Sequence, residues 1–545
     1  MLEQHFVICG DIETVGANKA LVHKLKLGKD KHKGQIYLDI DSITEKMVQD
    51  LPDVMHDLLE IATYVYVGDQ IVSRGGERRF DYGKKWHRCL NFKIPVRENE
   101  IWSDPEIRGL LEEALSFVSG DTYTFDFVPQ SKDAFPGFLN FRTEIEPRYE
   151  YNQVLLFSGG LDSFTGAIEE ILGNKNCPVL VSHQSNYKLV SLQRKLHEYL
   201  LSLCESGPEP LHVPVMINKE KRLTRETSQR TRSFLYASLG TIVASIFGLN
   251  CVRFYENGVI SCNLSFDGQT PQARSTRVTH PKFLSLLSRV VSAVLDHDFY
   301  FENPYFSKTR TGVCLRLKEL HHERQISATR SCAKAVYVKP ETHCGTCFQC
   351  IGRRFATLAS KCQDYDPQLL YALNIFTDNL DNIHDRAMAA GFAGFATRLD
   401  RMTLDDFVIR YSSEVHEITG YIPSVSREEA MRALFKLHRR HAQKVNGVLD
   451  ASIAENISSI RKGLLPDTCL LSMVARKEHL DIDKLFKKRK EAGKKHAKGE
   501  LEKKVSNLLD QDHYMSAQEI ANRIGNTTAD AIRHTMAWKK KHRKR

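Results

Sequence analysis

Residues 154–163 read Val-Leu-Leu-Phe-Ser-Gly-Gly-Leu-Asp-Ser, and the chain continues Phe-Thr-Gly-Ala-Ile-Glu-Glu-Ile-Leu. Apolar residues followed by a serine-glycine cluster predict a buried strand at 154–157, and apolar residues at helical spacing predict a helix at 163–172. A short glycine loop therefore joins a strand to a helix. Such a loop is suited to phosphate, because adjacent glycines let backbone N–H groups approach an anion and the helix N-terminus adds unpaired donors.

The candidates for anion binding in this loop are Ser158, Gly159, Gly160, Asp162 and Ser163. The two serines can add hydroxyl groups to the backbone donors. The loop is not a Walker A loop, because no Gly-Lys-Ser/Thr follows at the required spacing. The alternative is a strand-to-helix turn without a ligand, but such a turn does not need an aspartate between two serines.

Length and composition are those of a globular protein of about three or four domains. The N-terminus is acidic where a signal peptide needs positive charge, and no apolar stretch reaches membrane-spanning length. We therefore expect a cytoplasmic protein without a membrane partner. The 13 cysteines are an odd number, which favours reduced thiols and makes any cysteine cluster a candidate metal site.

The net charge of +10 is concentrated in one segment. Residues 484–545 contain 18 Lys and Arg against 7 Asp and Glu, a net charge of +11, and the preceding residues sum to −1. The basic character therefore belongs to the C-terminal tail.

Residues 1–150 predict an α+β domain of unknown role. Alternating or continuous apolar runs predict strands at 5–9, 35–40, 90–96 and 123–128, with helices near 54–67 and 105–118. The segment 69–79, which contains Gly-Gly-Glu-Arg-Arg, is interpreted as a solvated turn, with a functional loop as the alternative.

Residues 151–365 predict a parallel sheet with helices on both faces. Strands are expected at 154–157, 178–182, 211–215 and 251–255, separated by helices such as 188–204 and 233–247. Ligands of such sheets bind at the carboxyl ends of the strands, where the glycine loop leaves the first strand.

Two further basic residues could line the same edge. Arg230 begins the segment Arg-Thr-Arg-Ser-Phe-Leu, and its guanidinium could face a triphosphate or a carboxylate. Lys308 lies between Ser307 and Thr309; either of these could cap the following helix, which would leave Lys308 free to meet phosphate. The alternatives are a surface arginine pair and an ordinary helix cap.

Four cysteines predict a structural zinc site: Cys332, Cys344, Cys347 and Cys350. Two overlapping Cys-x-x-Cys units and one upstream cysteine can surround a tetrahedral ion, and His343 could replace one thiol. A redox pair is the alternative, but it does not need a third and fourth cysteine. A complete thiolate set leaves zinc no open position, so we expect the ion to hold a loop beside the active site.

The motif Ser-Gly-Gly-Leu-Asp-Ser after a buried strand resembles the pyrophosphate loop of the PP-loop ATP pyrophosphatases. The order of this loop, the Arg230 segment, Lys308, the cysteines and a following Arg-Arg pair is similar to that of 7-cyano-7-deazaguanine synthases (QueC), over residues 150–362. The resemblance implies a PP-loop domain of the Rossmann-like HUP class at 151–365. It further implies ATP-dependent adenylation of 7-carboxy-7-deazaguanine and C–N bond formation with ammonia to give an amide, which a second activation dehydrates to 7-cyano-7-deazaguanine.

Carried onto this chain, the resemblance implies a role for each candidate residue. The five loop residues would hold ATP and its pyrophosphate, Asp162 would help to hold Mg²⁺, and Asp162, Ser163, Lys308 and Arg230 would act in catalysis by positioning and neutralising phosphate. The four cysteines would bind Zn²⁺. The chain carries about 150 additional residues in front and 180 behind, a layout that resembles the QatC group of bacterial anti-phage defence clusters. That group implies an alternative acceptor, an amine of a partner protein.

The remaining segments predict helices. Residues 366–483 show apolar positions at helical spacing, and 484–545 form a basic linker followed by a helix-turn-helix-like tail, with a capping box at Ser516 and Glu519 and a second helix at 529–538. The tail could contact nucleic acid, dock a protein or serve only to increase solubility. Two other functions stay open: a nucleic-acid-modifying PP-loop enzyme, and a non-catalytic nucleotide-sensing component of a defence complex.

Overall fold

The structure is a computed structural model, and it describes a defined part of the chain. The described residues are 3–12, 21–28, 35–74, 87–130, 139–142, 144, 146–184, 187–205, 207–226, 229–265, 277–333, 343–422, 425–476, 501–510, 515–524, 532 and 535.

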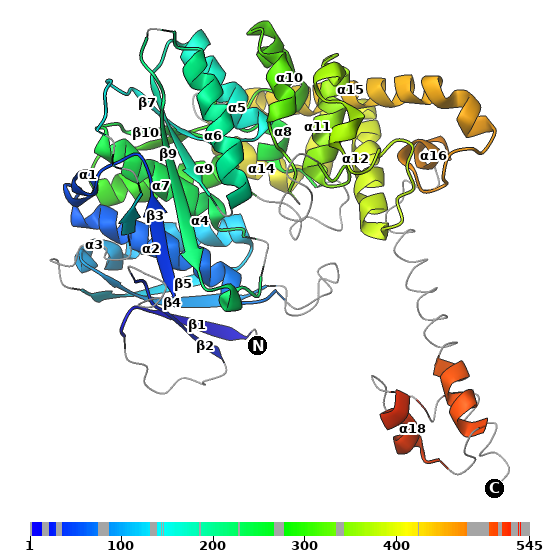
Figure 1. Cartoon of the computed structure of the whole chain (residues 1–545), viewed down its shortest axis with the longest axis horizontal. Helices are drawn as coiled ribbons and strands as arrows, with labels where there is room; N and C mark the ends of the chain where they lie inside the picture. The colour runs from blue at the N-terminus through cyan, green and yellow to red at the C-terminus, as the bar shows by residue number, and fades with distance from the viewer. Residues whose placement is uncertain are drawn as a thin grey trace.

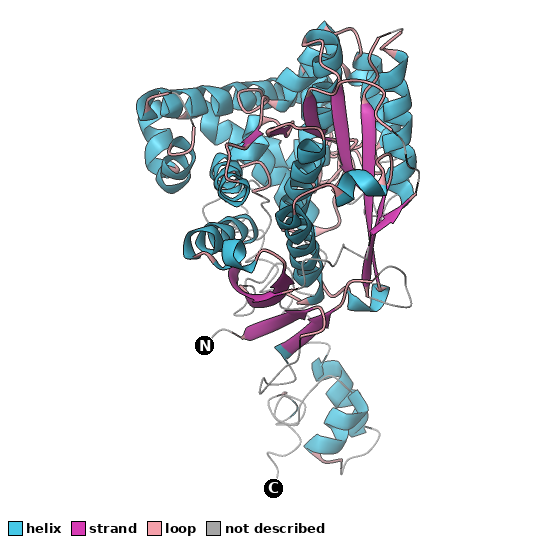
Figure 2. Ribbon diagram, turned by 90° about the vertical axis from the view of Figure 1, so that its left-hand side faces the viewer, coloured by secondary structure: helices cyan, strands magenta, loops and turns pink. Residues whose placement is uncertain are grey.

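Two β-sheets form the framework (Figures 1 and 2). A four-stranded sheet, here sheet A, is parallel throughout and has the order β2-β1-β4-β5. A seven-stranded sheet, here sheet B, has the order β11-β10-β7-β8-β9-β3-β6. The strands are β1 (Gln4–Cys9), β2 (Val22–Leu25), β3 (Ile36–Ile40), β4 (Cys89–Val96), β5 (Thr122–Pro129), β6 (Leu139–Phe141), β7 (Gln153–Leu156), β8 (Pro178–His183), β9 (Leu211–Lys219), β10 (Cys251–Arg253) and β11 (Tyr300–Glu302).

The α-helices lie between, over and beside the sheets. They are α1 (Glu45–Gln49), α2 (Asp53–Ile71), α3 (Asn99–Ser103), α4 (Pro105–Ser119), α5 (Leu161–Ile168), α6 (Tyr187–Ser202), α7 (Arg232–Ile246), α8 (Gly258–Cys262), α9 (Pro281–Leu295), α10 (Arg310–Glu319), α11 (Phe348–Ala359), α12 (Ile383–Arg401), α13 (Leu404–Arg410), α14 (Ser412–Thr419), α15 (Arg427–Arg461), α16 (Leu470–Ala475) and α18 (Ala517–Ile524).

The centre of sheet B has the strand order of a doubly wound α/β sheet. Its five mutually parallel strands, taken in chain order from β7, are arranged 3-2-1-4-5. This order matches five consecutive strands of the doubly wound sheet 3-2-1-4-5-6, and it includes strands from both of that sheet's halves. The strand order reverses between β7 and β10, and ligands of such sheets bind at the carboxyl ends of the strands at this switch point.

Alternating side chains on the strands bury both faces of sheet B. Val154 and Leu156 belong to a core with α7 and α9, whereas Leu155 and Phe157 pack with α5, α6 and α10. On the first face, α7 and α9 contact α2 and α4, which cover sheet A. The layers therefore run from sheet A through two helical layers to sheet B and then to α5 and α6 (Figure 1).

The structure confirms an α/β fold with the expected strands and helices near their expected positions. It also places strands from both sides of residue 150 in one sheet: β3 pairs antiparallel with β9, and β6 pairs with β3. The N-terminal segment therefore extends the central sheet. In the helical region from 366 onward, α12, α15 and α16 meet in a second core, which also includes Val259 of α8 and Phe355 of α11. Among the described helices, none has both the length and the apolar composition needed to cross a membrane.

Candidate functional site

The glycine loop has the expected strand–loop–helix geometry. β7 ends at Leu156 and α5 begins at Leu161. Gly159 has φ = +81°, a conformation that favours glycine, and a Cβ at this position would lie 3.2 Å from the Leu192 side chain. Gly160 is the N-cap of α5 and provides no side-chain cap. The first N–H groups of α5 therefore receive no acceptor from a cap side chain, which leaves them suited to an external anion.

The loop serines form a small hydrogen-bond network at the start of α5. The Oγ atoms of Ser158 and Ser163 are 3.1 Å apart, and the Ser163 hydroxyl donates to the carbonyl of Gly160 over 3.2 Å. The N–H of Gly160 donates to Ser158 Oγ over 3.3 Å. Ser158 is exposed, so one hydroxyl of this network faces solvent beside the helix N-terminus.

Asp162 joins the ends of the two strands at the switch point. Its Oδ2 accepts hydrogen bonds from the backbone N–H of Asn257 over 3.0 Å and from Asn257 Nδ2 over 2.7 Å. Its Oδ1 is 3.4 Å from Nε of Arg310, and the residue is 5% exposed. Asp162 therefore anchors the loop after β7 to the segment after β10, and its predicted contact with Mg²⁺ or ATP stays a prediction.

Two carboxyl groups share the Arg310 guanidinium. Arg310 Nη2 is 3.3 Å from Oε1 of Glu256. Burial opposes ionisation of Asp162, but Arg310 and the Asn257 hydrogen bonds outweigh it and lower the pKa of Asp162. Burial and the nearby charge of Asp162 raise the pKa of Glu256 well above its usual value. Of the two carboxyl groups, Asp162 therefore ionises at the lower pH and is the main partner of the Arg310 charge.

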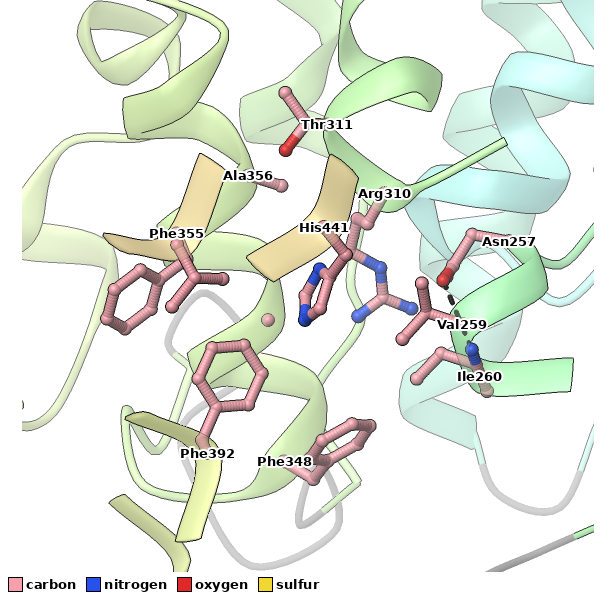
Figure 3. Close-up of a pocket in the computed structure, with 12 residues that line it drawn as sticks. Asn257, Val259, Ile260, Arg310, Thr311, Phe348, Phe355, Ala356, Phe392 and His441 are labelled. Carbon is pink, nitrogen blue, oxygen red and sulfur yellow. Dashed lines mark hydrogen bonds between the residues drawn. The ribbon is translucent and has the colours of Figure 1, made fainter. Parts of the chain in front are cut away.

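A cavity of about 20 Å³ lies behind this ion pair, between the central sheet region and the helical region. Figure 3 shows the Arg310 guanidinium next to the imidazole of His441 from α15, with Phe348 and Phe392 below them. Burial, then His438, then Arg310 lower the pKa of His441 to about 3. The neutral imidazole therefore adds no charge to the Asp162–Arg310 pair.

Lys308 lies in the segment between β11 and α10. Its ammonium stands over the ring of Tyr305, 5.4 Å from the centroid, and its carbonyl accepts the N–H of Gly258 over 2.8 Å. Thr309 caps α10 by accepting the N–H of Gly312 over 3.1 Å, which confirms Thr309 as one of the two expected caps. The contact of Lys308 with phosphate stays a prediction.

Arg230 lies at the junction with the N-terminal segment. It is 4% exposed, and its Nη1 donates to the carbonyl of Ser119 over 2.9 Å. Burial and the nearby Arg74 lower the pKa of Arg230 to about 10. This hydrogen bond ties Arg230 to the end of α4. The contact of Arg230 with phosphate stays a prediction.

Beside Arg230 is a buried charge network that the sequence did not indicate. Arg88 is 2% exposed, donates to the carbonyls of Asp69 and Val72 over 2.8 and 2.6 Å, and pairs with the carboxylates of Asp69 and Asp121. Asp69 also accepts the N–H of Thr231 over 3.2 Å. The segment 69–79 therefore begins as a buried junction where a solvated turn was expected, and its residues 75–79 lie outside the described part of the chain.

The four predicted metal ligands come together. The sulfur atoms of Cys332, Cys344, Cys347 and Cys350 all lie within 4.8 Å of one another, and those of Cys344 and Cys350 are 3.8 Å apart. Four sulfurs at about 2.3 Å from zinc would be separated by about 3.8 Å in a tetrahedron. The cluster therefore has the dimensions of a Cys₄ metal site and could hold an ion such as zinc.

Local geometry orients the thiols in this cluster. The N–H of Cys347 points to Cys344 Sγ over 3.3 Å, and the N–H of Cys350 points to Cys347 Sγ over 3.4 Å. Gly345 has φ = +81°, and a Cβ there would lie 2.2 Å from the carbonyl oxygen of Leu373. His343 stacks on Tyr371 with ring centroids 5.1 Å apart. The four thiols therefore form the cluster without His343 as a fifth member.

The cysteine cluster is connected to the glycine loop by the chain itself. Two residues before Cys332, the N–H of Arg330 donates to the carbonyl of Gly159 over 3.0 Å. The buried Arg353 of α11 donates to the Thr329 and Ile326 carbonyls over 3.2 and 2.6 Å. The cluster thus lies next to the loop, as expected for an ion that holds it in place.

The described part of the tail confirms the capping box. The N–H of Ser516 donates to Oε2 of Glu519 over 2.7 Å, and the N–H of Glu519 donates to Ser516 Oγ over 3.2 Å. Residues 505–532 include a small apolar cluster of their own. The second helix, expected at 529–538, lies outside the described residues apart from isolated positions.

Comparison with known proteins assigns no family: no protein-family model matches the chain, and no curated protein matches it.

Proposed function

We propose that this chain is an ATP-dependent enzyme of the PP-loop type, which adenylates the carboxylate of a 7-carboxy-7-deazaguanine and then forms a C–N bond. The observation that carries the proposal is the position of the 158–163 loop. It leaves β7 where the strand order of sheet B reverses, and α5 begins there without a side-chain cap. The resemblance to the QueC and QatC groups supplies the substrate class and the setting, anti-phage defence.

The proposed reaction has two steps. A carboxylate oxygen attacks the α-phosphorus of ATP and pyrophosphate leaves; then a nitrogen attacks the acyl adenylate, loses a proton and displaces AMP. Both steps depend on positioning and on neutralising phosphate charge, so no protein nucleophile is required. Bound Mg²⁺ would neutralise the triphosphate.

Each proposed role uses a feature of the site. The N–H groups of α5 and the hydroxyls of Ser158 and Ser163 would bind the phosphates, Asp162 would fix the loop to the β10 end, and Lys308 would add positive charge. Zinc in the cysteine cluster would hold Arg330 against the loop. The acceptor would be ammonia or an amine of a partner protein.

The first experiment measures pyrophosphate release by the full chain with ATP and 7-carboxy-7-deazaguanine, with ammonium or with a candidate partner protein as acceptor. The proposal expects release that requires the deazaguanine, and mass spectrometry of the product identifies the acceptor. Ser163→Ala should lower the rate roughly a hundred-fold. Ser202→Ala, which removes an exposed hydroxyl on α6, should leave the rate unchanged.

Nucleotide sensing without turnover is the second candidate, and one observation favours it. Both oxygens of Asp162 face protein partners, so this loop carboxylate has no oxygen turned away from Asn257 and Arg310. A sensor should bind ATP in calorimetry and release no pyrophosphate with any acceptor. That combination would contradict the catalytic proposal.

A further inference from the structure

A groove runs along one side of α15. Its volume is about 580 Å³, within the range of protein ligand sites. Its floor is formed by Ala430, Ala433, Leu434 and Leu437, which follow the i, i+3, i+4, i+7 spacing of one helix face. The two alanines keep this floor low, so that another backbone can approach α15 closely.

The opposite wall is also apolar. It includes Phe306, Ile422 and Val425, and Val425 is 49% exposed. Along α15 the groove extends from Glu429 to Gln443, about 21 Å or four helical turns. An apolar channel of this length, open to solvent on one side, matches the footprint of one short amphipathic helix.

The rim of the groove is positively charged. Lys436, Arg439 and Arg440 line it together with one acidic residue, Glu429, whose carboxylate is engaged by the hydroxyl of Ser426 over 2.7 Å. Arg440 donates to the carbonyl of Ser307 over 3.0 Å. Within the described part of the chain, Lys436 and Arg439 form no ion pair, and both are exposed. The rim therefore favours an acidic occupant.

Charge also argues against the C-terminal segment of this chain as the occupant. The C-terminal segment 484–545 of this chain carries a net charge of +11, so the basic rim repels it. Nucleic acid has the right charge, but the floor presents apolar side chains where a phosphate backbone needs donors.

We propose that this groove binds a short amphipathic helix of a partner protein, with an apolar face against Ala430–Leu437 and acidic residues against Lys436 and Arg439. The groove includes Phe306 and Ser307, directly before Lys308, so the docked partner lies beside the candidate site. The docking does not depend on catalysis by that site.

The test uses fluorescence anisotropy with the full chain and two labelled helical peptides of about four turns. Both carry leucines at i, i+3, i+4 and i+7; one has glutamates at the remaining positions and the other has lysines. The expected result is at least about ten-fold tighter binding of the acidic peptide, equal to 1.4 kcal/mol. Ala433→Glu, at an exposed helix position, should abolish this binding.

Charge reversal gives the sharper result. In the variant Lys436→Glu with Arg439→Glu, binding of the acidic peptide should be at least about ten-fold weaker, and binding of the basic peptide should be tighter. The control reverses two exposed charges at the far end of α15, Arg461→Glu with Lys462→Glu, and should bind like the wild type. No binding of the acidic peptide, or equal effects of the two reversals, would overturn the proposal. So would sedimentation showing a dimer that Ala433→Glu dissociates, because the occupant would then be a second copy.

Discussion

The backbone N–H of Arg330 donates a hydrogen bond to the carbonyl of Gly159 over 3.0 Å, which joins the segment leading to Cys332 directly to the glycine loop. The carbonyl of Arg330 is also 3.7 Å from where a Cβ of Gly160 would stand. A metal ion that fixes Cys332 would therefore fix one wall of the loop, so its structural effect extends beyond its own ligands.

Cys344→Ser should remove the metal and loosen the glycine loop. The sulfur of Cys344 lies 3.8 Å from Cys350 and accepts the N–H of Cys347, so its loss leaves an incomplete ligand set. We expect metal content to fall from about one ion per chain to about none, with a lower soluble yield and faster hydrogen exchange at the amides of residues 158–163.

Cys204→Ser is the matched control for this variant. Cys204 is half-buried, lies outside the cluster and directs its thiol to the Leu200 carbonyl. It should retain the metal. If Cys344→Ser keeps its full metal content, the ligand assignment is wrong; if the metal is lost while loop exchange stays unchanged, the Arg330 connection does not hold the loop.

Gly159→Ala should destabilise the protein more than Gly160→Ala. Gly159 has φ = +81°, which costs a residue with a Cβ about 1–2 kcal/mol, whereas Gly160 has φ = −77° and needs no such change. Urea unfolding of both variants measures the difference directly. Equal losses would mean that the Gly159 conformation is not maintained in solution.

The local part of the site could be predicted from the sequence. The strand, the glycine turn, the start of α5 and the cysteine cluster depend on residues close together in the chain, where spacing and turn chemistry are informative. The contacts of Asp162 with Asn257 and of Arg330 with Gly159 join segments about a hundred residues apart or more. No local pattern encodes such pairs.

The same lack of a local signal explains why the sequence did not indicate that the N-terminal segment joins sheet B, or that charged residues at its junction are buried. β6 has three residues, too few for a periodic signal, and the antiparallel pairing of β3 with β9 follows only from the packing of the whole chain. Asp69 and Arg230 were judged as surface or ligand-binding groups because charged residues are rarely buried. In the structure each is buried with partners supplied by distant segments.

Asp162→Asn combined with Glu256→Gln should destabilise the protein by more than the sum of the two single changes. In the wild type Asp162 carries the charge that balances Arg310, and its presence helps to keep Glu256 protonated. When either carboxyl is removed, the other can ionise and pair with Arg310, so each single loss is partly compensated. The double variant leaves Arg310 buried without an anion in this group, which costs about 3–5 kcal/mol.

A double-mutant cycle by urea unfolding tests this prediction, with a coupling energy of about 0.5–3 kcal/mol expected. Simple additivity would show that the two carboxyl groups do not exchange roles. The exposed Asp405→Asn variant serves as a control and should change the free energy of unfolding by less than about 0.5 kcal/mol.

Buried histidines should make the protein less stable as the pH falls. His438 is fully buried; its Nδ1 is 2.8 Å from the Leu434 carbonyl, and its Nε2 has no hydrogen-bond partner among the described residues. Burial lowers the pKa of His438 to about 4 from its ordinary 6.5. Between these values the unfolded chain binds a proton that the folded protein does not. The stabilisation is therefore complete above pH 6.5 and is lost as the pH falls toward 4, at up to about 1.4 kcal/mol per pH unit. His438→Leu should reduce the slope of unfolding free energy against pH by that amount between about pH 6.5 and 4.5. The exposed Ser202→Ala variant, which removes no titratable group, should retain the wild-type slope. Comparing slopes removes the cost of the lost hydrogen bond, which does not depend on pH, and any metal release that is common to all variants. If the slope of His438→Leu equals that of the wild type, this histidine already binds a proton in the folded protein.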